Sequence, residues 1–98
     1  MKVTLIAVGT AATALGWMEK ELMVQDSTTV ADLLSCNNVR DGRTLLQFML
    51  DEEKQRSKLP YAVMLEGRDV LSTEGLRTKL EDKNKVVVMN LIRLLVGG

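Results

Sequence analysis

The last two residues of the chain have the least ordinary chemistry in the sequence. Gly97 and Gly98 lack Cβ atoms, so they can adopt backbone angles closed to other residues and pass through a narrow channel. An α-carboxyl group has an ordinary pKa of about 3.5 and is ionised near neutral pH. The Gly98 carboxylate can therefore attack a nucleotide phosphate, giving an acyl-adenylate that a sulfur or amine nucleophile opens.

The segment before the glycines determines how far this carboxylate can reach. Residues 90–98 read Asn-Leu-Ile-Arg-Leu-Leu-Val-Gly-Gly, and an extended chain of this length spans roughly 30 Å. That reach lets the end enter a partner's active site while the folded body stays outside. Taken alone, a terminal Gly-Gly is equally compatible with a frayed chain end that has no role.

Internal residues offer little for catalysis. The chain has no His, which removes His-based acid–base catalysis, the usual Ser-His and Cys-His pairs, and His-ligated metals. No phosphate-binding glycine motif is present, so ATP chemistry would belong to a partner. Cys36 is interpreted as a small hydrophobic residue on a helix, and the acidic cluster 51–53 as a solvated helix end, so we expect no metal site.

Composition and charge narrow the class of protein. The 98 residues suit a single domain spanning 1–98, with 46% apolar and 27% charged residues. Thirteen basic and thirteen acidic residues balance, which disfavours nucleic acid as a partner. A single Cys and no signal-peptide pattern indicate a reducing, cytoplasmic location. The apolar runs are far shorter than the roughly 20 residues needed to cross a membrane, so we expect no membrane partner.

The elements that must position this end follow from the hydrophobic pattern. Residues 2–8 predict a strand, residues 9–16 a loop of small residues, and residues 18–25 a second strand paired with the first. Thr29 and Asp32 form an approximate capping box, so a helix begins near Val30.

Later elements alternate helix and strand. A second helix is predicted over 44–57 and is stopped by Leu59-Pro60. A third strand is predicted over 61–65 with a turn at Glu66-Gly67, and one short helical turn over 75–80. Residues 86–89 are continuously apolar and predict a central strand buried on both faces.

This order of elements predicts an α+β fold. An N-terminal hairpin, a helical crossing and two later strands most economically form one mixed sheet of four to five strands with a helix on one face, a β-grasp roll. Residues 90–98 then form a C-terminal tail. A ferredoxin-like fold is the alternative, but residues 71–80 are too few for its second full helix.

Several short motifs, in this order and spacing, resemble a known family. They are Thr-Val-Ala-Asp-Leu-Leu at 29–34, Leu-Pro at 59–60, Leu-Glu-Gly-Arg-Asp-Val at 65–70, the valines at 86–88, and the final Gly-Gly. Across nearly the whole chain the sequence resembles the MoaD and ThiS type of sulfur carrier, a branch of the ubiquitin-like β-grasp superfamily.

The resemblance implies a carrier protein and not an enzyme. An ATP-dependent activating enzyme would adenylate Gly98, and a sulfur donor protein would convert it to a thiocarboxylate for molybdopterin, thiazole or transfer-RNA thiolation. Molybdopterin synthase large subunit or thiazole synthase would be further partners. The tail segment expected to dock on the activating enzyme comprises Arg93, Leu94, Leu95 and Val96.

Two other functions remain open at this point. Some relatives become attached to lysines of other proteins, with Gly98 as the isopeptide site. Alternatively, the chain is a ubiquitin-like interaction module that docks without any covalent step, its aliphatic tail completing a strand or a dimer interface. Exposed apolar patches often mark such contacts. Removing Gly97 and Gly98 separates the interaction module from the two covalent functions.

Overall fold

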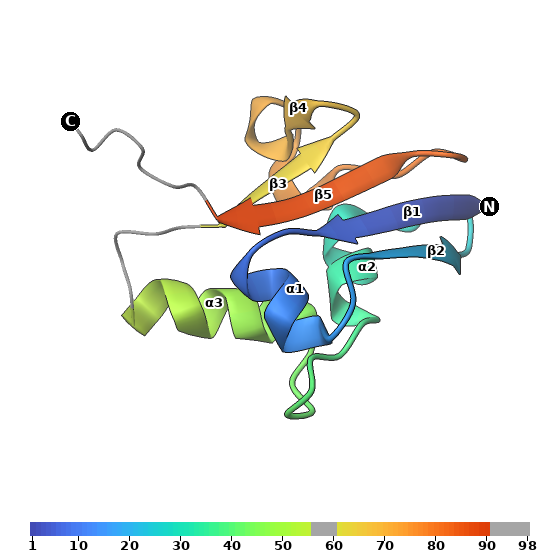
Figure 1. Cartoon of the computed structure of the whole chain (residues 1–98). Helices are drawn as coiled ribbons and strands as arrows, with labels where there is room; N and C mark the ends of the chain where they lie inside the picture. Colours follow the sequence, from blue (N-terminus) through green and yellow to red (C-terminus); the bar gives the residue numbers. More distant parts are fainter. Residues whose placement is uncertain (56–60, 91–98) are drawn as a thin grey trace.

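A mixed five-stranded sheet organises the computed structural model, which describes residues 1–55 and 61–90 (Figure 1). The strand order is β2-β1-β5-β3-β4. The strands are β1 (Lys2–Ala7), β2 (Glu19–Met23), β3 (Tyr61–Leu65), β4 (Arg68–Asp69) and β5 (Lys85–Asn90). This confirms the predicted sheet of four to five strands, together with all four strands that the sequence indicated.

The first and last of these strands lie side by side at the centre of the sheet. β1 pairs in parallel with β5, with Thr4 opposite Lys85 and Ala7 opposite Val88. The other pairs, β1 with β2, β3 with β5 and β3 with β4, are antiparallel. The predicted N-terminal hairpin is therefore confirmed, and it supplies two of the five strands, at one side of the sheet.

Only one face of the sheet is buried under the helices. Successive side chains of a strand point to opposite faces, and Val86 and Val88 are fully buried while Val87 and Met89 are only half-buried. The prediction that residues 86–89 are buried on both faces is therefore wrong. Its continuous apolar run reflects a covered face and a second apolar face that the helices leave open.

The covered face packs on α2 (Val30–Ser35), which begins as the sequence predicts. The Thr29 hydroxyl accepts a hydrogen bond from the Asp32 amide (3.1 Å), and the Asp32 carboxylate accepts one from the Thr29 amide (3.0 Å). This reciprocal capping box satisfies two amides that the helix itself leaves unpaired. Leu33 and Leu34 are fully buried, and burial of each leucine side chain contributes about 1.5–3 kcal/mol.

A short helix, α1 (Thr10–Leu15), occupies the region predicted to be a loop, so that prediction is wrong. Gly9 and Gly16 flank it with positive φ angles of 71° and 87°, which glycine adopts without steric cost. Ala11 and Leu15, four positions apart, are buried. The glycines end the helix and do not interrupt it, and the alanines between them are good helix formers.

The connection from α2 to α3 (Leu45–Gln55) carries a cluster of charge. It loops back so that Arg43 bonds to both Asp41 (2.6 Å) and Asp51 (3.0 Å). The hydrogen bonds from Arg43 hold the pKa of Asp41 below its ordinary value. The end of the predicted 44–57 helix and its stop at Leu59-Pro60 lie outside the described residues.

The segment from β3 to β5 contains no full helix. The predicted turn at Glu66-Gly67 is confirmed, with positive φ at both residues, and it leads into β4, which the sequence did not indicate. Two single 3₁₀ turns follow, at Val70–Ser72 and Gly75–Arg77. A ferredoxin-like fold would need a helix here, so the structure excludes that alternative.

The cap of α2 is open to a direct test. Replacing Thr29→Ala removes one partner of the box, and we expect a loss of about 1 kcal/mol in the free energy of unfolding. In a domain of this size, that loss lowers Tm by about 4–8 °C. Thermal unfolding followed by circular dichroism measures it.

The matched control for this variant is Thr13→Ala. The Thr13 hydroxyl is exposed and bonds only to the Gly9 carbonyl within its own turn, at 3.4 Å. We expect its unfolding free energy to stay within about 0.5 kcal/mol of the parent value. Equal losses in the two variants would contradict a specific role for the cap.

Candidate functional site

The residues that the sequence nominated for chemistry follow the last described strand. Gly97 and Gly98 lie outside the described residues, as does the predicted docking segment, Arg93, Leu94, Leu95 and Val96. What the structure supplies is the part of the body from which this segment continues, namely the end of β5 at Asn90 (Figure 1). The site is therefore built from the surroundings of that strand end.

The end of β5 lies between two strands that hold it on both sides. Tyr61, the first residue of β3, lies opposite Asn90, and on the β1 side the Val8 amide donates to the Val88 carbonyl (2.9 Å). Because β1 and β5 are parallel, their carboxyl ends reach the same edge of the sheet. The last described residue thus lies at the end of a central strand and not at the margin of the sheet.

A bond between two hydroxyl groups braces this edge. The hydroxyls of Thr10 and Tyr61 lie 2.6 Å apart and link the start of α1 to the start of β3. The Tyr61 ring is buried and packs against Phe48 of α3, with ring centroids 6.0 Å apart and planes tilted by 57°. Aromatic pairs with this tilt are favourable, so the exit point of the chain is anchored to two helices.

The open face of the sheet is apolar along its three central strands. Ile6, Val87 and Met64 lie in register across β1, β5 and β3 and are half-buried. Val8 extends this strip toward the exit point and is 42% exposed. We call the set the open-face strip: Ile6, Val8, Met64, Val87 and Met89. Val8 is the exposed member of the strip, and the other four residues are half-buried.

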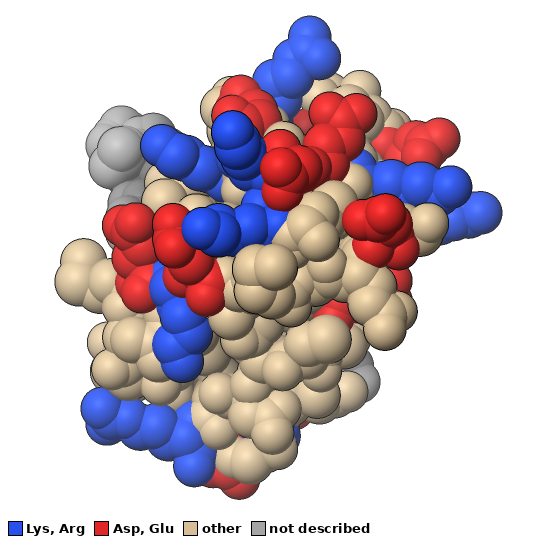
Figure 2. Space-filling view, turned by 90° about the vertical axis from the view of Figure 1, so that its right-hand side faces the viewer, with Lys and Arg blue, Asp and Glu red and all other residues tan. Residues whose placement is uncertain are grey.

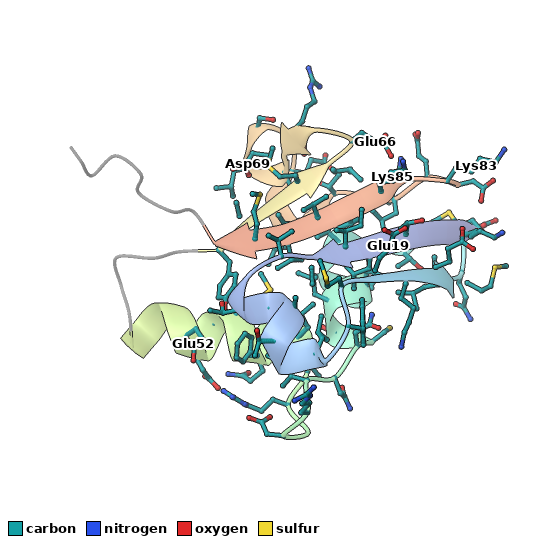
Figure 3. All side chains as sticks on the ribbon, in the orientation of Figure 1. Glu19, Glu52, Glu66, Asp69, Lys83 and Lys85 are labelled. Carbon is teal, nitrogen blue, oxygen red and sulfur yellow. The ribbon has the colours of Figure 1, made fainter. Side chains whose placement is uncertain are left out.

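Charged side chains border the open-face strip (Figure 3). Lys85 and Glu66 lie together at the β3–β4 turn, where the Glu66 carboxylate accepts a hydrogen bond from the Lys85 amide (2.6 Å). Asp69 accepts from the Leu71 amide (2.9 Å). Both carboxylates therefore satisfy backbone amides, and neither is positioned as a catalytic acid or base.

The described residues contain no cluster of metal-ligating side chains. No group of three or more His, Cys, Asp or Glu side chains within 1–55 and 61–90 could hold a metal ion. Asp41 and Arg43 form an exposed ion pair. The hydrogen bonds from Arg43 lower the pKa of Asp41, and the hydrogen bonds to Asp41 and Asp51 raise the pKa of Arg43. Perturbed titration thus identifies no catalytic centre here.

Cys36 and Asp51 are both outside the sheet, on the surfaces of α2's end and of α3. Cys36 is exposed and follows α2 as its C-cap residue, so the interpretation of Cys36 as a small hydrophobic residue on a helix is wrong. The side chain follows the last full turn of that short helix, where it no longer faces the sheet. Asp51, in the acidic cluster, bonds to Arg43 and to Gln47, consistent with a charged helix surface.

Sequence reasoning did not nominate the open-face strip. The signal was present, because both alternating sets of residues in 2–8 and in 86–89 contain large aliphatic side chains. A strand with one face in water normally alternates with polar residues. Residues 2–8 and 86–89 have large aliphatic side chains on both faces instead. Because these two strands are neighbours in the sheet, they indicate an apolar surface on the uncovered face.

No helix in the described part of the chain is both long and apolar enough to cross a bilayer.

Comparisons with known proteins show similarity in structure only. No protein-family model matches the chain, and neither does any curated protein. Among solved structures, SAMP1 from Haloferax volcanii is 12% identical with a TM-score of 0.62, covering 94% of this chain and 97% of its own. Urm1 from Trypanosoma brucei is 15% identical with a TM-score of 0.68, covering 93% and 92%.

A third similar structure comes from Pyrococcus furiosus. The Pyrococcus furiosus protein named molybdopterin converting factor, subunit 1, is 16% identical with a TM-score of 0.58, and the match covers 94% of this chain and 99% of that protein. These matches run over almost the whole length of each protein. Together with the five-stranded mixed sheet and its central parallel pair, they show that the chain has the ubiquitin-like β-grasp fold.

Proposed function

We propose that the chain is a ubiquitin-like sulfur carrier, activated at the carboxylate of Gly98 by a partner enzyme. The observation that carries this proposal is a β-grasp body whose central strand, β5, leads directly into a segment ending in Gly-Gly. The names of the similar structures, which include a modifier protein and a subunit of molybdopterin converting factor, support the same kind of function.

The proposed chemistry takes place at the carrier's carboxylate within the partner's active site. An oxygen of the Gly98 carboxylate attacks the α-phosphorus of ATP, and pyrophosphate leaves. Sulfide, or its equivalent from a sulfur donor, attacks the acyl carbon and displaces AMP, which leaves a thiocarboxylate. The ATP site and the catalytic groups belong to the activating enzyme, and this chain contributes Gly97, Gly98 and the segment from Arg93 to Val96.

The folded body would provide the surface that binds the activating enzyme. The open-face strip crosses β1, β5 and β3 and includes Met89, the residue before Asn90, so one docking event would cover the strip and bring the chain end to the active site. Burying apolar surface contributes a favourable free energy of about 25 cal/mol for each Å² removed from water. Binding energy gained there offsets the cost of ordering the end in the active site.

The sulfur could pass to several acceptors. The resemblance suggests molybdopterin, a thiazole precursor or transfer RNA, with molybdopterin synthase large subunit or thiazole synthase as the receiving protein. An amine nucleophile in place of sulfide would instead give an isopeptide bond to a lysine. Both outcomes share the same acyl-adenylate at Gly98.

Activation at the chain end can be tested with purified proteins. Incubation with activating enzymes of the MoaD, ThiS and Urm1 partner type, ATP and sodium sulfide should give a mass increase equal to replacement of one oxygen by sulfur. Tandem mass spectrometry should place the change on Gly98. A reaction without ATP serves as control.

Deletion of Gly97 and Gly98 separates the carrier from a module that only docks. We expect the shortened chain to bind the activating enzyme but to support no ATP–pyrophosphate exchange, because the nucleophilic carboxylate has moved. Full exchange by the shortened chain, or failure of the intact chain to form an adduct with any of these enzymes, would refute activation at Gly98.

A second prediction concerns the open-face strip. Replacing Val8→Glu places a charge in the strip at its most exposed residue, and we expect the KM for the carrier in ATP–pyrophosphate exchange to rise by about tenfold. The kcat should change little, since Gly98 is untouched.

Leu71→Glu is the matched control, because Leu71 is also apolar and is 80% exposed but lies outside the strip. We expect its KM to equal that of the parent chain. Equal effects in the two variants, with both folded by circular dichroism, would show that the strip has no special part in docking.

A further inference from the structure

The outer edge of β2 has backbone groups that can accept another strand. β2 is the outermost strand on its side, and Met18 and Val24 bond inward to β1 at its two ends (2.8 and 2.9 Å). An antiparallel ladder bonds at every second residue, so Glu19, Glu21 and Met23 turn their N–H and C=O groups outward. Within residues 1–55 and 61–90, no strand pairs with that outer side.

A groove runs between this edge and α2. It has a volume of about 640 Å³, within the range of ligand-binding clefts. Its lining is mainly apolar and includes Leu22, Met23, Val24, Leu33 and Cys36. Leu22 and Val24 pack against the core at its floor, whereas Met23 is 75% exposed. Figure 2, which looks toward the end where β2 finishes, shows a broad uncharged area bordered by charged side chains.

The outward-turned residues also carry a pattern of charge. Glu19 and Glu21 project on the open face, opposite Ile6 and Thr4 of β1, and both are exposed. Glu21 lies 3.9 Å from Lys2, and no ion pair with Glu19 is present in the described residues. Charged residues on an edge normally oppose pairing with another strand. Two acidic residues at alternate positions oppose an acidic strand and attract a basic one.

We propose that the outer edge of β2 binds an extended, basic segment of a partner protein as an added antiparallel strand. Its backbone bonds to Glu19, Glu21 and Met23, and its basic side chains lie opposite the two glutamates. Its alternate, apolar side chains enter the groove against Leu22 and Val24. Backbone pairing then supplies affinity, and the alternating pattern supplies specificity. This site uses no residue of the 90–98 segment and is independent of activation at Gly98.

A second copy of the chain fits this edge less well than such a segment. Antiparallel pairing of two β2 edges about Glu21 places the two Glu21 carboxylates directly opposite each other. Pairing one position earlier places Glu19 opposite Glu21 twice. Like charges directly opposite are destabilising, and the register centred on Leu22, which avoids them, pairs only residues 21–23 of each β2.

A capped peptide that alternates lysine and valine over the length of β2 is the probe for this site. Cys36 is the only cysteine of the chain, is exposed and lines the groove, so the rate of its alkylation reports occupancy. We expect the peptide to slow alkylation of Cys36 severalfold. Hydrogen exchange should slow at the amides of Glu19, Glu21 and Met23.

Two methylated peptides provide the matched control. In the proposed pairing, the lysine residues lie opposite the glutamates and donate their N–H groups to β2, whereas the valine N–H groups point away. Backbone N-methylation of the lysines should abolish protection, and N-methylation of the valines should preserve it. Equal protection by both peptides would overturn the added-strand geometry.

Charge reversal tests the chemistry of the partner. The double variant Glu19→Lys and Glu21→Lys should bind the lysine peptide about tenfold more weakly, because two cross-strand attractions become repulsions. It should bind a glutamate–valine peptide more tightly than the parent does. Unchanged preference in a folded variant would overturn the proposal, as would protection that increases with chain concentration in the absence of peptide.

Discussion

Parallel pairing between β1 and β5 is the constraint on which the rest of the structure depends. Parallel neighbours need a long connection between them, and here that connection carries α1, β2, α2, α3, β3 and β4. The pairing also brings the carboxyl ends of both strands to one edge. The Thr10–Tyr61 bond and the Tyr61 ring anchor that edge, at which β5 ends.

The two faces of the sheet have different tasks. The face under α2 and α3 supplies the apolar burial that stabilises the fold, and it contains no buried charged residue among those described. The opposite face keeps large aliphatic side chains in contact with water, which costs solubility and adds nothing to the core. A partner that covers the strip would remove this exposed apolar surface from water. The strip includes Met89, the residue before the end of β5 at Asn90.

Local signals in the sequence predicted the parts of the fold that local physics controls. The capping box at Thr29 depends on residues three positions apart, and it formed as expected. The errors at α1, at Cys36 and on the open face of β5 each required tertiary information: which side chains the sheet covers, and where a short helix turns away from it. The nominated chemistry, at Gly97 and Gly98, remains a prediction because those residues lie outside the described part.

The central position of β5 has a consequence for the order in which the protein can fold. Thr4 meets Lys85 only after almost all of the described chain has left the ribosome. Until then, β1 and β3 each lack a neighbour, and their unpaired edges can associate with other nascent chains. Contacts between residues so distant in sequence also slow folding. Cellular yield should therefore depend on protection of the growing chain more than on the stability of the finished domain.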